Sequence, residues 1–228
     1  LLMCLMGSLR LSANSWTADN GNGTFTNPLF YDEFTDPDMI RVGTDYYLVG
    51  SSMHSMPGLP LLKSKDLVNW EFESYVSGYL DLGPDFHLEG NKGIYGNGIW
   101  APAIRYHNGT FYVFVNVNDH GLQVFSSENP KGPWKHINMG GKIYDLGILF
   151  DDNGRIYAVY GYDEVHLIEL KPDFSGYVKG SDRIIIPKGN AMGEGHHFYK
   201  IKGKYYIISA DYSPVGRMEC ARADSLYG

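Results

Sequence analysis

The feature that most constrains the fold is a hairpin unit that occurs four times along the chain. In each unit a short apolar strand leads to a turn glycine, and a Tyr with an apolar run follows it closely. The turn glycines are Gly43, Gly109, Gly154 and Gly203. A third strand is expected after each hairpin, over residues 59–64, 122–127, 165–170 and 218–223. Since the turns are polar, as hairpin turns are, the repeat predicts four similar antiparallel sheets.

The spacing of the units indicates the blades of a propeller. Successive turn glycines are 66, 45 and 49 residues apart, close to the roughly 40 to 50 residues of one blade. A Gly-rich insert over residues 77–98 lengthens the first interval. The second strands are apolar on both faces, as sheets stacked between neighbours require. We therefore predict an all-β, five-bladed β-propeller with about four blades in this chain, and we expect the domain to continue past Gly228.

Composition narrows the classes of ligand. The net charge is −7, and the 19 Lys and Arg residues form no cluster. This argues against a nucleic acid or an anionic membrane as partner, because both require a basic surface. The aromatic share of 14% favours ligands with faces that stack. The two cysteines, Cys4 and Cys220, imply no disulfide framework.

The first 26 residues are expected to lie outside the propeller domain, which is predicted for residues 27–228. Residues 1–13 resemble the apolar tail and small-residue cleavage region of a secretory signal peptide whose basic start is missing, followed by a polar leader. A buried first strand or helix is the alternative. The first interpretation predicts a secreted or periplasmic protein, and no stretch is long enough to span a membrane.

Three acidic residues occupy related places in the repeat. Asp36 precedes its turn glycine by seven residues, and Asp145 and Glu194 precede theirs by nine. All three are thus predicted at the start of an inner strand, where they converge at one end of the propeller axis. Burial and like charge should raise at least one pKa in such a group. A protonated carboxyl facing an ionised one is what cleavage of a glycosidic bond requires.

Each of these residues also has a plain structural interpretation. Asp36 before a proline can cap a turn, Asp145 can be a turn residue, and Glu194 can be an exposed loop acid. The run Asp151-Asp152-Asn153-Gly154 is too short for a calcium loop, so a hairpin turn is favoured. The adjacent residues His196 and His197 should point to opposite faces of a strand, which argues against a zinc site.

Over residues 27–228 the chain resembles glycoside hydrolase family 43. The resemblance rests on the following motifs: Asp36-Pro37-Asp38-Met39-Ile40-Arg41-Val42-Gly43, Ser64-Lys65-Asp66-Leu67-Val68-Asn69-Trp70, Trp100-Ala101-Pro102, Tyr144-Asp145-Leu146-Gly147-Ile148-Leu149-Phe150-Asp151-Asp152-Asn153-Gly154, and Gly193-Glu194-Gly195-His196-His197-Phe198-Tyr199-Lys200.

The resemblance implies a five-bladed propeller and inverting hydrolysis of xylose- or arabinose-containing glycans, such as those of plant cell walls. It implies Asp36 as general base, Glu194 as general acid and Asp145 as the carboxylate that tunes and orients the acid. Leu146 stands where the family often has Pro, which puts only the loop geometry in doubt. No cofactor is expected, although the family sometimes holds a structural calcium on the propeller axis.

Sugar contacts are predicted for Trp100, Met53 and His54, with core packing as the alternative for the first two. Within the resemblance, xylosidase and arabinofuranosidase activities stay open, as does an arabinan-type endo or exo action. A retaining, fructan-type five-bladed hydrolase is a further alternative. A propeller that binds glycans without cleaving them is the non-enzymatic one. The oligomeric state is not predicted.

Overall fold

The computed structural model describes residues 16–51, 53, 58–87, 89–91, 93, 99–212 and 214–228. The chain divides into two compact units, Leu1–Asp32 and Glu33–Gly228. In the described part of the first unit, a bridge joins Asp19 to Phe25, and the indole of Trp16 donates to the carbonyl of Pro28 at 2.9 Å. The predicted signal-peptide remnant lies outside the described residues, and the domain boundary after residue 26 stays a prediction.

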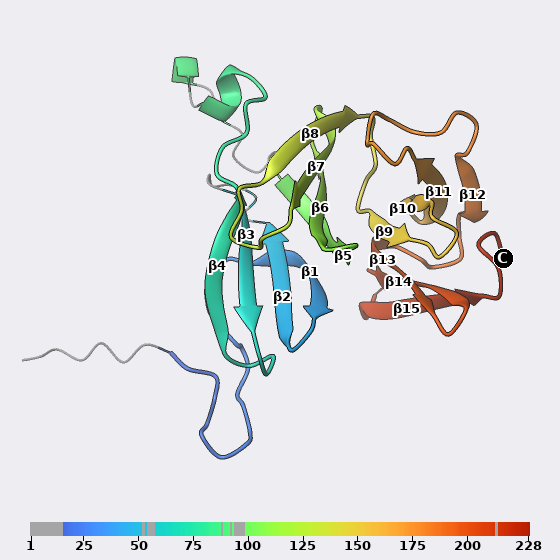
Figure 1. Cartoon of the computed structure of the whole chain (residues 1–228). Helices are drawn as coiled ribbons and strands as arrows, with labels where there is room; N and C mark the ends of the chain where they lie inside the picture. Colours follow the sequence, from blue (N-terminus) through green and yellow to red (C-terminus); the bar gives the residue numbers. More distant parts are fainter. Residues whose placement is uncertain are drawn as a thin grey trace, which may run out of the picture. The chain divides into compact units, whose positions relative to one another are not determined.

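The second unit consists of four antiparallel sheets in chain order (Figure 1). In each sheet the strands follow one another as a meander, from the inner strand outward, as the hairpin repeat predicted. The strands are β1 (Thr35–Val42), β2 (Asp45–Ser51), β3 (Gly58–Ser64), β4 (Trp70–Ser77); β5 (Ile99–His107), β6 (Thr110–Val117), β7 (Gly121–Ser127), β8 (Lys135–Gly140); β9 (Gly147–Phe150), β10 (Ile156–Tyr162), β11 (Glu164–Leu170), β12 (Arg183–Ile186); and β13 (Glu194–Ile201), β14 (Lys204–Asp211), β15 (Arg217–Ala223).

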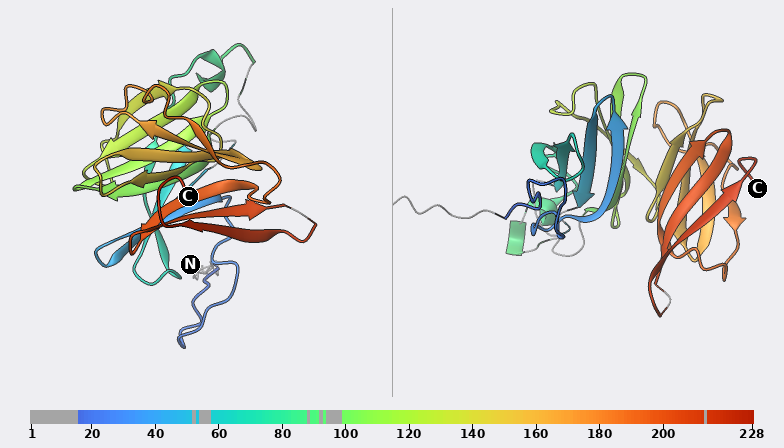
Figure 2. Two further views of the ribbon diagram at one scale, coloured as in Figure 1. Left: turned by 90° about the vertical axis from the view of Figure 1, so that its right-hand side faces the viewer. Right: turned by 90° about the horizontal axis from the view of Figure 1, so that it is seen from below.

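The sheets are stacked face to face as propeller blades, as two further views show (Figure 2). Three apolar clusters fill the spaces between successive sheets. In the second cluster, for example, Phe114 of β6 packs with Ile148 of β9 and Ala158 of β10, and all three are fully buried. The all-β propeller is therefore confirmed, and its four blades are consistent with part of a five-bladed ring.

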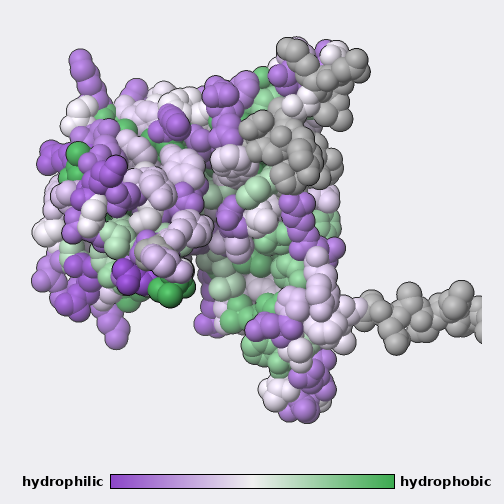
Figure 3. Space-filling view, turned by 180° about the vertical axis from the view of Figure 1, so that it is seen from behind, coloured by the Kyte–Doolittle hydropathy of each residue, from purple (hydrophilic) through white to green (hydrophobic). Residues whose placement is uncertain are grey.

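The burial of the second strands explains why their sequences are apolar on both faces in the central blades. Strand β6 is buried along nearly its whole length, because its sheet has a neighbouring sheet on each side. In strand β14 half-buried residues predominate toward the start and then alternate with buried ones; its Ile207 belongs to a core cluster, and Tyr205 packs against that cluster. Polar residues cover most of the surface that the third and fourth sheets show on the left of Figure 3.

The insert after β4 contains two short 3₁₀ helices, η1 (Pro84–His87) and η2 (Glu89–Asn91). Its Leu80 and Phe86 are buried in the cluster between the first two blades, so this part of the insert packs onto the propeller. Residues 94–98 of the insert lie outside the described residues. Among the described residues, no helix is long and apolar enough to cross a membrane.

Candidate active site

A residue with an unusual backbone conformation lies at or shortly before the start of every inner strand. A residue with positive φ lies there in each blade, namely Asp36 (46°), Ala101 (42°), Asp145 (49°) and Gly195 (66°). The pairing register shifts at the same places in β1, β5 and β13. Such bulges bend a strand and turn its side chains in a new direction. Because Asp adopts positive φ more readily than most residues, it suits this position.

This repeated backbone feature brings the predicted site residues together. A pocket of about 440 Å³ is lined by Asp36, Asp145 and Glu194, each from a different blade. Trp100 and Met53 line the same pocket. The predicted convergence of the three carboxyls is therefore confirmed, while their individual catalytic roles stay predictions. His54 lies outside the described residues.

Glu194 differs from the other two acids in its place on the strand. It stands one residue before the positive-φ position, whereas Asp36 and Asp145 occupy that position themselves. By this register, Glu194 corresponds to Tyr144 in the third blade and to Trp100 in the second. Asp145 and Glu194 each precede their turn glycine by nine residues, so the sequence spacing did not reveal that they differ by one position on the strand.

Burial and mutual repulsion change the acidity of the cluster. Burial raises the pKa of Asp145 to about 7, and the nearby charges of Glu194 and Asp36 add to the effect. The pKa of Asp36 is also raised, first by burial and then by the charge of Glu194. The direction of both shifts agrees with the expectation that at least one pKa in the group is raised. Near neutral pH the cluster therefore retains a proton, as acid catalysis by a carboxyl requires.

The raised pKa predicts a pH-dependent effect of Asp145→Asn on stability. Because the folded pKa of about 7 exceeds the reference value of 3.8, the native state binds more protons than the unfolded state between these values. The stabilisation by the protonated carboxyl is thus fully present below about pH 4 and is lost as the pH rises through about 7. Asp145→Asn should therefore have a higher Tm, relative to wild type, at pH 8 than at pH 5 in thermal melts.

Glu71→Gln is the control for this measurement, because Glu71 is an exposed carboxyl on β4. Its Tm difference from wild type should be the same at both pH values. An equally constant difference for Asp145→Asn would contradict the raised pKa of Asp145.

The backbone around Glu194 is held by its neighbours. Gly193 has a φ of 47°, and a Cβ at this position would lie 1.8 Å from the carbonyl oxygen of Ala210, so only glycine fits against β14. The amide of Gly195 donates to Oδ2 of Asp145 at 3.2 Å, and the amide of His196 donates to the Asp145 carbonyl at 3.1 Å. Asp145 thus anchors the start of β13 through both its side chain and its backbone.

Tyr144 is a further site residue, which was not predicted from the sequence. It donates a hydrogen bond to Oε2 of Glu194 at 2.7 Å. Tyr212 and Met218 also line the pocket, and Tyr212 is 67% exposed. Trp100, Met53 and Met218 give the pocket an apolar wall beside its carboxyls, and the phenol of Tyr212 faces Glu194. Tyr144 directly precedes Asp145 in the sequence, whereas Tyr212 and Met218 share no repeated distance to a turn glycine with the other site residues.

An ion pair between Asp38, which lines the pocket, and Arg105 joins the first two blades. Asp38 on β1 is almost fully buried and pairs with Arg105 on β5. Its carboxylate also accepts from the amides of Met39 and Ile104, each at 2.9 Å. Burial alone would raise the pKa of Asp38, but the charge of Arg105 and a hydrogen bond from His197 outweigh it and lower the pKa to about 2.

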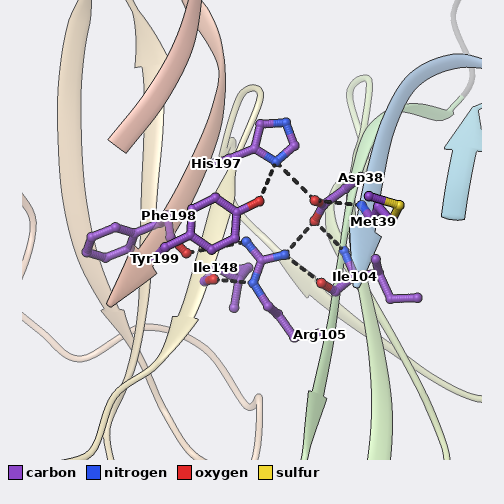
Figure 4. A network of polar contacts seen from close by, with 8 residues as sticks. All are labelled: Asp38, Met39, Ile104, Arg105, Ile148, His197, Phe198 and Tyr199. Carbon is purple, nitrogen blue, oxygen red and sulfur yellow. Dashed lines mark hydrogen bonds and ion pairs between the residues drawn. The ribbon is translucent and has the colours of Figure 1, made fainter. Parts of the chain in front are cut away.

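Arg105 contacts all four inner strands (Figure 4). Besides Asp38 on β1 and its own strand β5, its guanidinium donates to the carbonyl of Ile148 on β9 at 2.6 Å. It also donates to the carbonyl of Phe198 on β13 at 3.5 Å and lies over the ring of Tyr199, 5.4 Å from its centroid. One largely enclosed cation therefore links the inner strands of all four blades beside the three pocket acids.

The two adjacent histidines of β13 contact different partners. Nδ1 of His197 lies 3.0 Å from Asp38, and since an ionised carboxylate only accepts, this nitrogen carries the proton. His196 is buried and contacts the hydroxyl of Ser209 at 2.6 Å, and burial lowers its pKa to about 4.

The described residues do not fit a metal site. Within this part of the chain, no group of three or more His, Cys, Asp or Glu side chains could hold an ion. The run from Asp151 to Gly154 forms a hairpin turn, in which the amide of Gly154 donates to the Asp151 carbonyl at 2.9 Å. The Asp151 carboxylate pairs instead with Lys200 at 2.6 Å. A calcium ion on the axis stays an untested expectation.

The fold and the site together define a β-propeller whose inner strands gather three carboxyls in one pocket. The family model described as "Glycosyl hydrolases family 43" matches residues 25–228, and the chain belongs to this family. The resemblance inferred from the sequence motifs is thereby confirmed.

Several relatives carry related names. "Beta-xylosidase" of Formosa agariphila is 32% identical over 224 residues, covering 90% of this chain and 37% of its own length. "Non-reducing end alpha-L-arabinofuranosidase BoGH43B" of Bacteroides ovatus is 35% identical over 195 residues, covering 82% of this chain and 36% of its own. The structure "Bifunctional GH43-CE" of Bacteroides eggerthii superposes with a TM-score of 0.83 at 36% identity, covering 89% of this chain and 28% of that one. The chain thus spans little more than a third of the curated relatives it matches.

Proposed function

We propose that the protein is an inverting glycosidase that removes xylosyl or arabinofuranosyl residues from the non-reducing ends of plant cell-wall glycans or their oligosaccharides. The observation that carries this proposal is the meeting of Asp36, Asp145 and Glu194 in one pocket beside Trp100. The names of the two relatives above support the choice of pentosyl substrates. The apolar wall of the pocket suits the face of a sugar ring.

In the proposed reaction Glu194 protonates the glycosidic oxygen as the bond to the anomeric carbon breaks. Asp36 accepts a proton from a water molecule, whose oxygen attacks the same carbon from the opposite face. The products are a sugar of inverted configuration and the shortened glycan. Afterwards Asp36 holds the extra proton, Glu194 is ionised, and exchange with solvent restores both groups.

Asp145 has a supporting role in this proposal. Its side chain holds the amide of Gly195, directly after the acid, and the charges of the other two carboxyls act on it. Because three ionised carboxyls in one pocket repel each other, the cluster favours a state with one proton. Catalysis requires that proton on Glu194 when the substrate is bound.

The stereochemistry of the first product tests the mechanism. With a 4-nitrophenyl β-D-xyloside we expect α-xylose as the first sugar seen by proton NMR, before mutarotation produces the mixture. With an α-L-arabinofuranoside the first product should be the β-anomer. First release of the retained anomer would contradict single displacement and support a retaining, fructan-type mechanism instead. Sugar binding with no product from either class would support a glycan-binding propeller.

We also infer that the protein is exported, because its first 13 residues have the character of a signal-peptide remnant. N-terminal sequencing of the mature protein from its natural host tests this inference. A mature chain that retains residues 1–13 would contradict it.

A further inference from the structure

We propose that Tyr144 is a positioning residue for the acid: its phenol holds Oε2 of Glu194, so that the catalytic proton is carried by Oε1. This inference rests on the proposed function, since it refines the role given to Glu194. It concerns a residue of the third blade that acts on the acid of the fourth.

The backbone places the two side chains against each other. Tyr144 directly precedes the positive-φ residue Asp145, and Glu194 directly precedes the positive-φ residue Gly195. The two residues therefore occupy the same place in neighbouring blades, Tyr144 shortly before β9 and Glu194 at the start of β13, and these two strands lie side by side in Figure 1. The Tyr144 carbonyl accepts from the amide of Gly161 at 3.0 Å, which fixes the backbone from which the phenol extends.

The phenol acts as a donor in this contact. Burial, the hydrogen bond to Glu194 and the charge of Asp145 all raise the pKa of Tyr144, so the hydroxyl stays protonated. The hydroxyl donates its single hydrogen to Oε2, and the two oxygens lie 2.7 Å apart. In a protonated carboxyl the carbonyl oxygen is the better acceptor, so the acid proton belongs on the other oxygen, Oε1.

The contact also becomes stronger during the reaction. When Glu194 gives up its proton it becomes a carboxylate, and a hydrogen bond to an ionised acceptor is stronger than one to a neutral acceptor. The stabilisation therefore grows with the charge that develops on Glu194 in the transition state. In the first two blades the corresponding residues are Thr35 and Trp100, so the phenol occurs in this position only in the third blade.

Tyr144→Phe tests this inference because it removes only the hydroxyl. We expect kcat on a substrate with a poor leaving group, such as xylobiose or an alkyl pentoside, to fall about 10- to 100-fold, in line with the loss of a hydrogen bond to a charged group. For a 2,4-dinitrophenyl pentoside, whose leaving group needs little protonation, the loss should be less than about threefold. The basic limb of the pH profile should move to higher pH, because ionised Glu194 loses a donor.

Two further variants make the test decisive. Tyr106→Phe is the matched control, since Tyr106 lies at the far end of β5 and does not line the pocket; it should leave both substrates unaffected. Replacement of Tyr144 by 3,5-difluorotyrosine keeps the hydroxyl and makes it a stronger donor. This replacement should move the basic limb of the pH profile to lower pH, whereas Tyr144→Phe should move it to higher pH. The result with difluorotyrosine does not depend on how well the Tyr144→Phe variant folds.

The outcomes separate this inference from the proposed function. If Glu194→Gln shows no dependence on the leaving group, the assignment of the acid is wrong. If Glu194→Gln shows that dependence but Tyr144→Phe reduces both substrates equally, or neither, the positioning role of Tyr144 is wrong and the acid assignment stands.

Discussion

Glu194→Gln should reduce kcat on xylobiose or an arabino-oligosaccharide by a factor on the order of 10²–10⁴, the usual contribution of a general acid. The amide cannot protonate the leaving oxygen, although it fills the same space. Asp36→Asn should cause a loss of the same order, because the attacking water loses its base. The two variants should differ on a 2,4-dinitrophenyl pentoside, where Glu194→Gln retains much of its activity and Asp36→Asn does not. Steady-state kinetics on the two substrates measures this difference.

Glu128→Gln is the matched control for these substitutions, because Glu128 is exposed in the turn after β7. Its kinetics should equal those of wild type. Thermal melts should show that Glu194→Gln and Asp36→Asn are folded. Turnover near the wild-type rate by either site variant, on the unactivated substrate, would remove that residue from the mechanism.

Arg105→Met should produce the largest loss of stability among single substitutions in the inner strands. Asp38 has a side-chain exposure of 1%, so removal of its cation leaves a buried charge without its partner. Breaking a buried pair in this way costs roughly 3–5 kcal/mol. The substitution also removes the donors to Ile148 and Phe198, which join β9 and β13 to β5. Urea denaturation followed by tryptophan fluorescence measures the change in the free energy of unfolding.

Two comparisons identify the cause of that loss. The double variant Asp38→Asn/Arg105→Met removes both charges and should recover part of the stability. Lys204→Met breaks an exposed pair with Asp224 and should cost less than about 1 kcal/mol. If Arg105→Met costs no more than Lys204→Met, the axial network does not hold the blades together.

The same network connects stability to the site. Asp38 lies two residues after Asp36, and His197 lies three residues after Glu194. A change in the Asp38–Arg105 pair therefore displaces the strands that carry the proposed base and acid. Because catalytic groups must be held within a fraction of an ångström, even a folded Arg105 variant should have reduced activity.

Much of the site could be anticipated because each acid lies in a locally recognisable hairpin. The turn glycines mark the blades, and counting back from them leads to Asp36, Asp145 and Glu194. The Trp100 motif marked the corresponding place in the second blade, and Trp100 and Met53 indeed line the pocket. Counting did not show that Glu194 stands one step ahead of the other acids, since bulges change the register without changing the composition.

The sequence by itself determined the repeat, the strand order and the family, because hairpin turns and apolar strands are formed by residues close together along the chain. Only the tertiary structure decided that Arg105 pairs with Asp38, 67 residues away, and that Tyr144 holds Glu194, 50 residues away. These partners meet because stacked blades bring their inner strands around one axis. A contact of that kind depends on the backbone of several blades at once, and no local pattern records it.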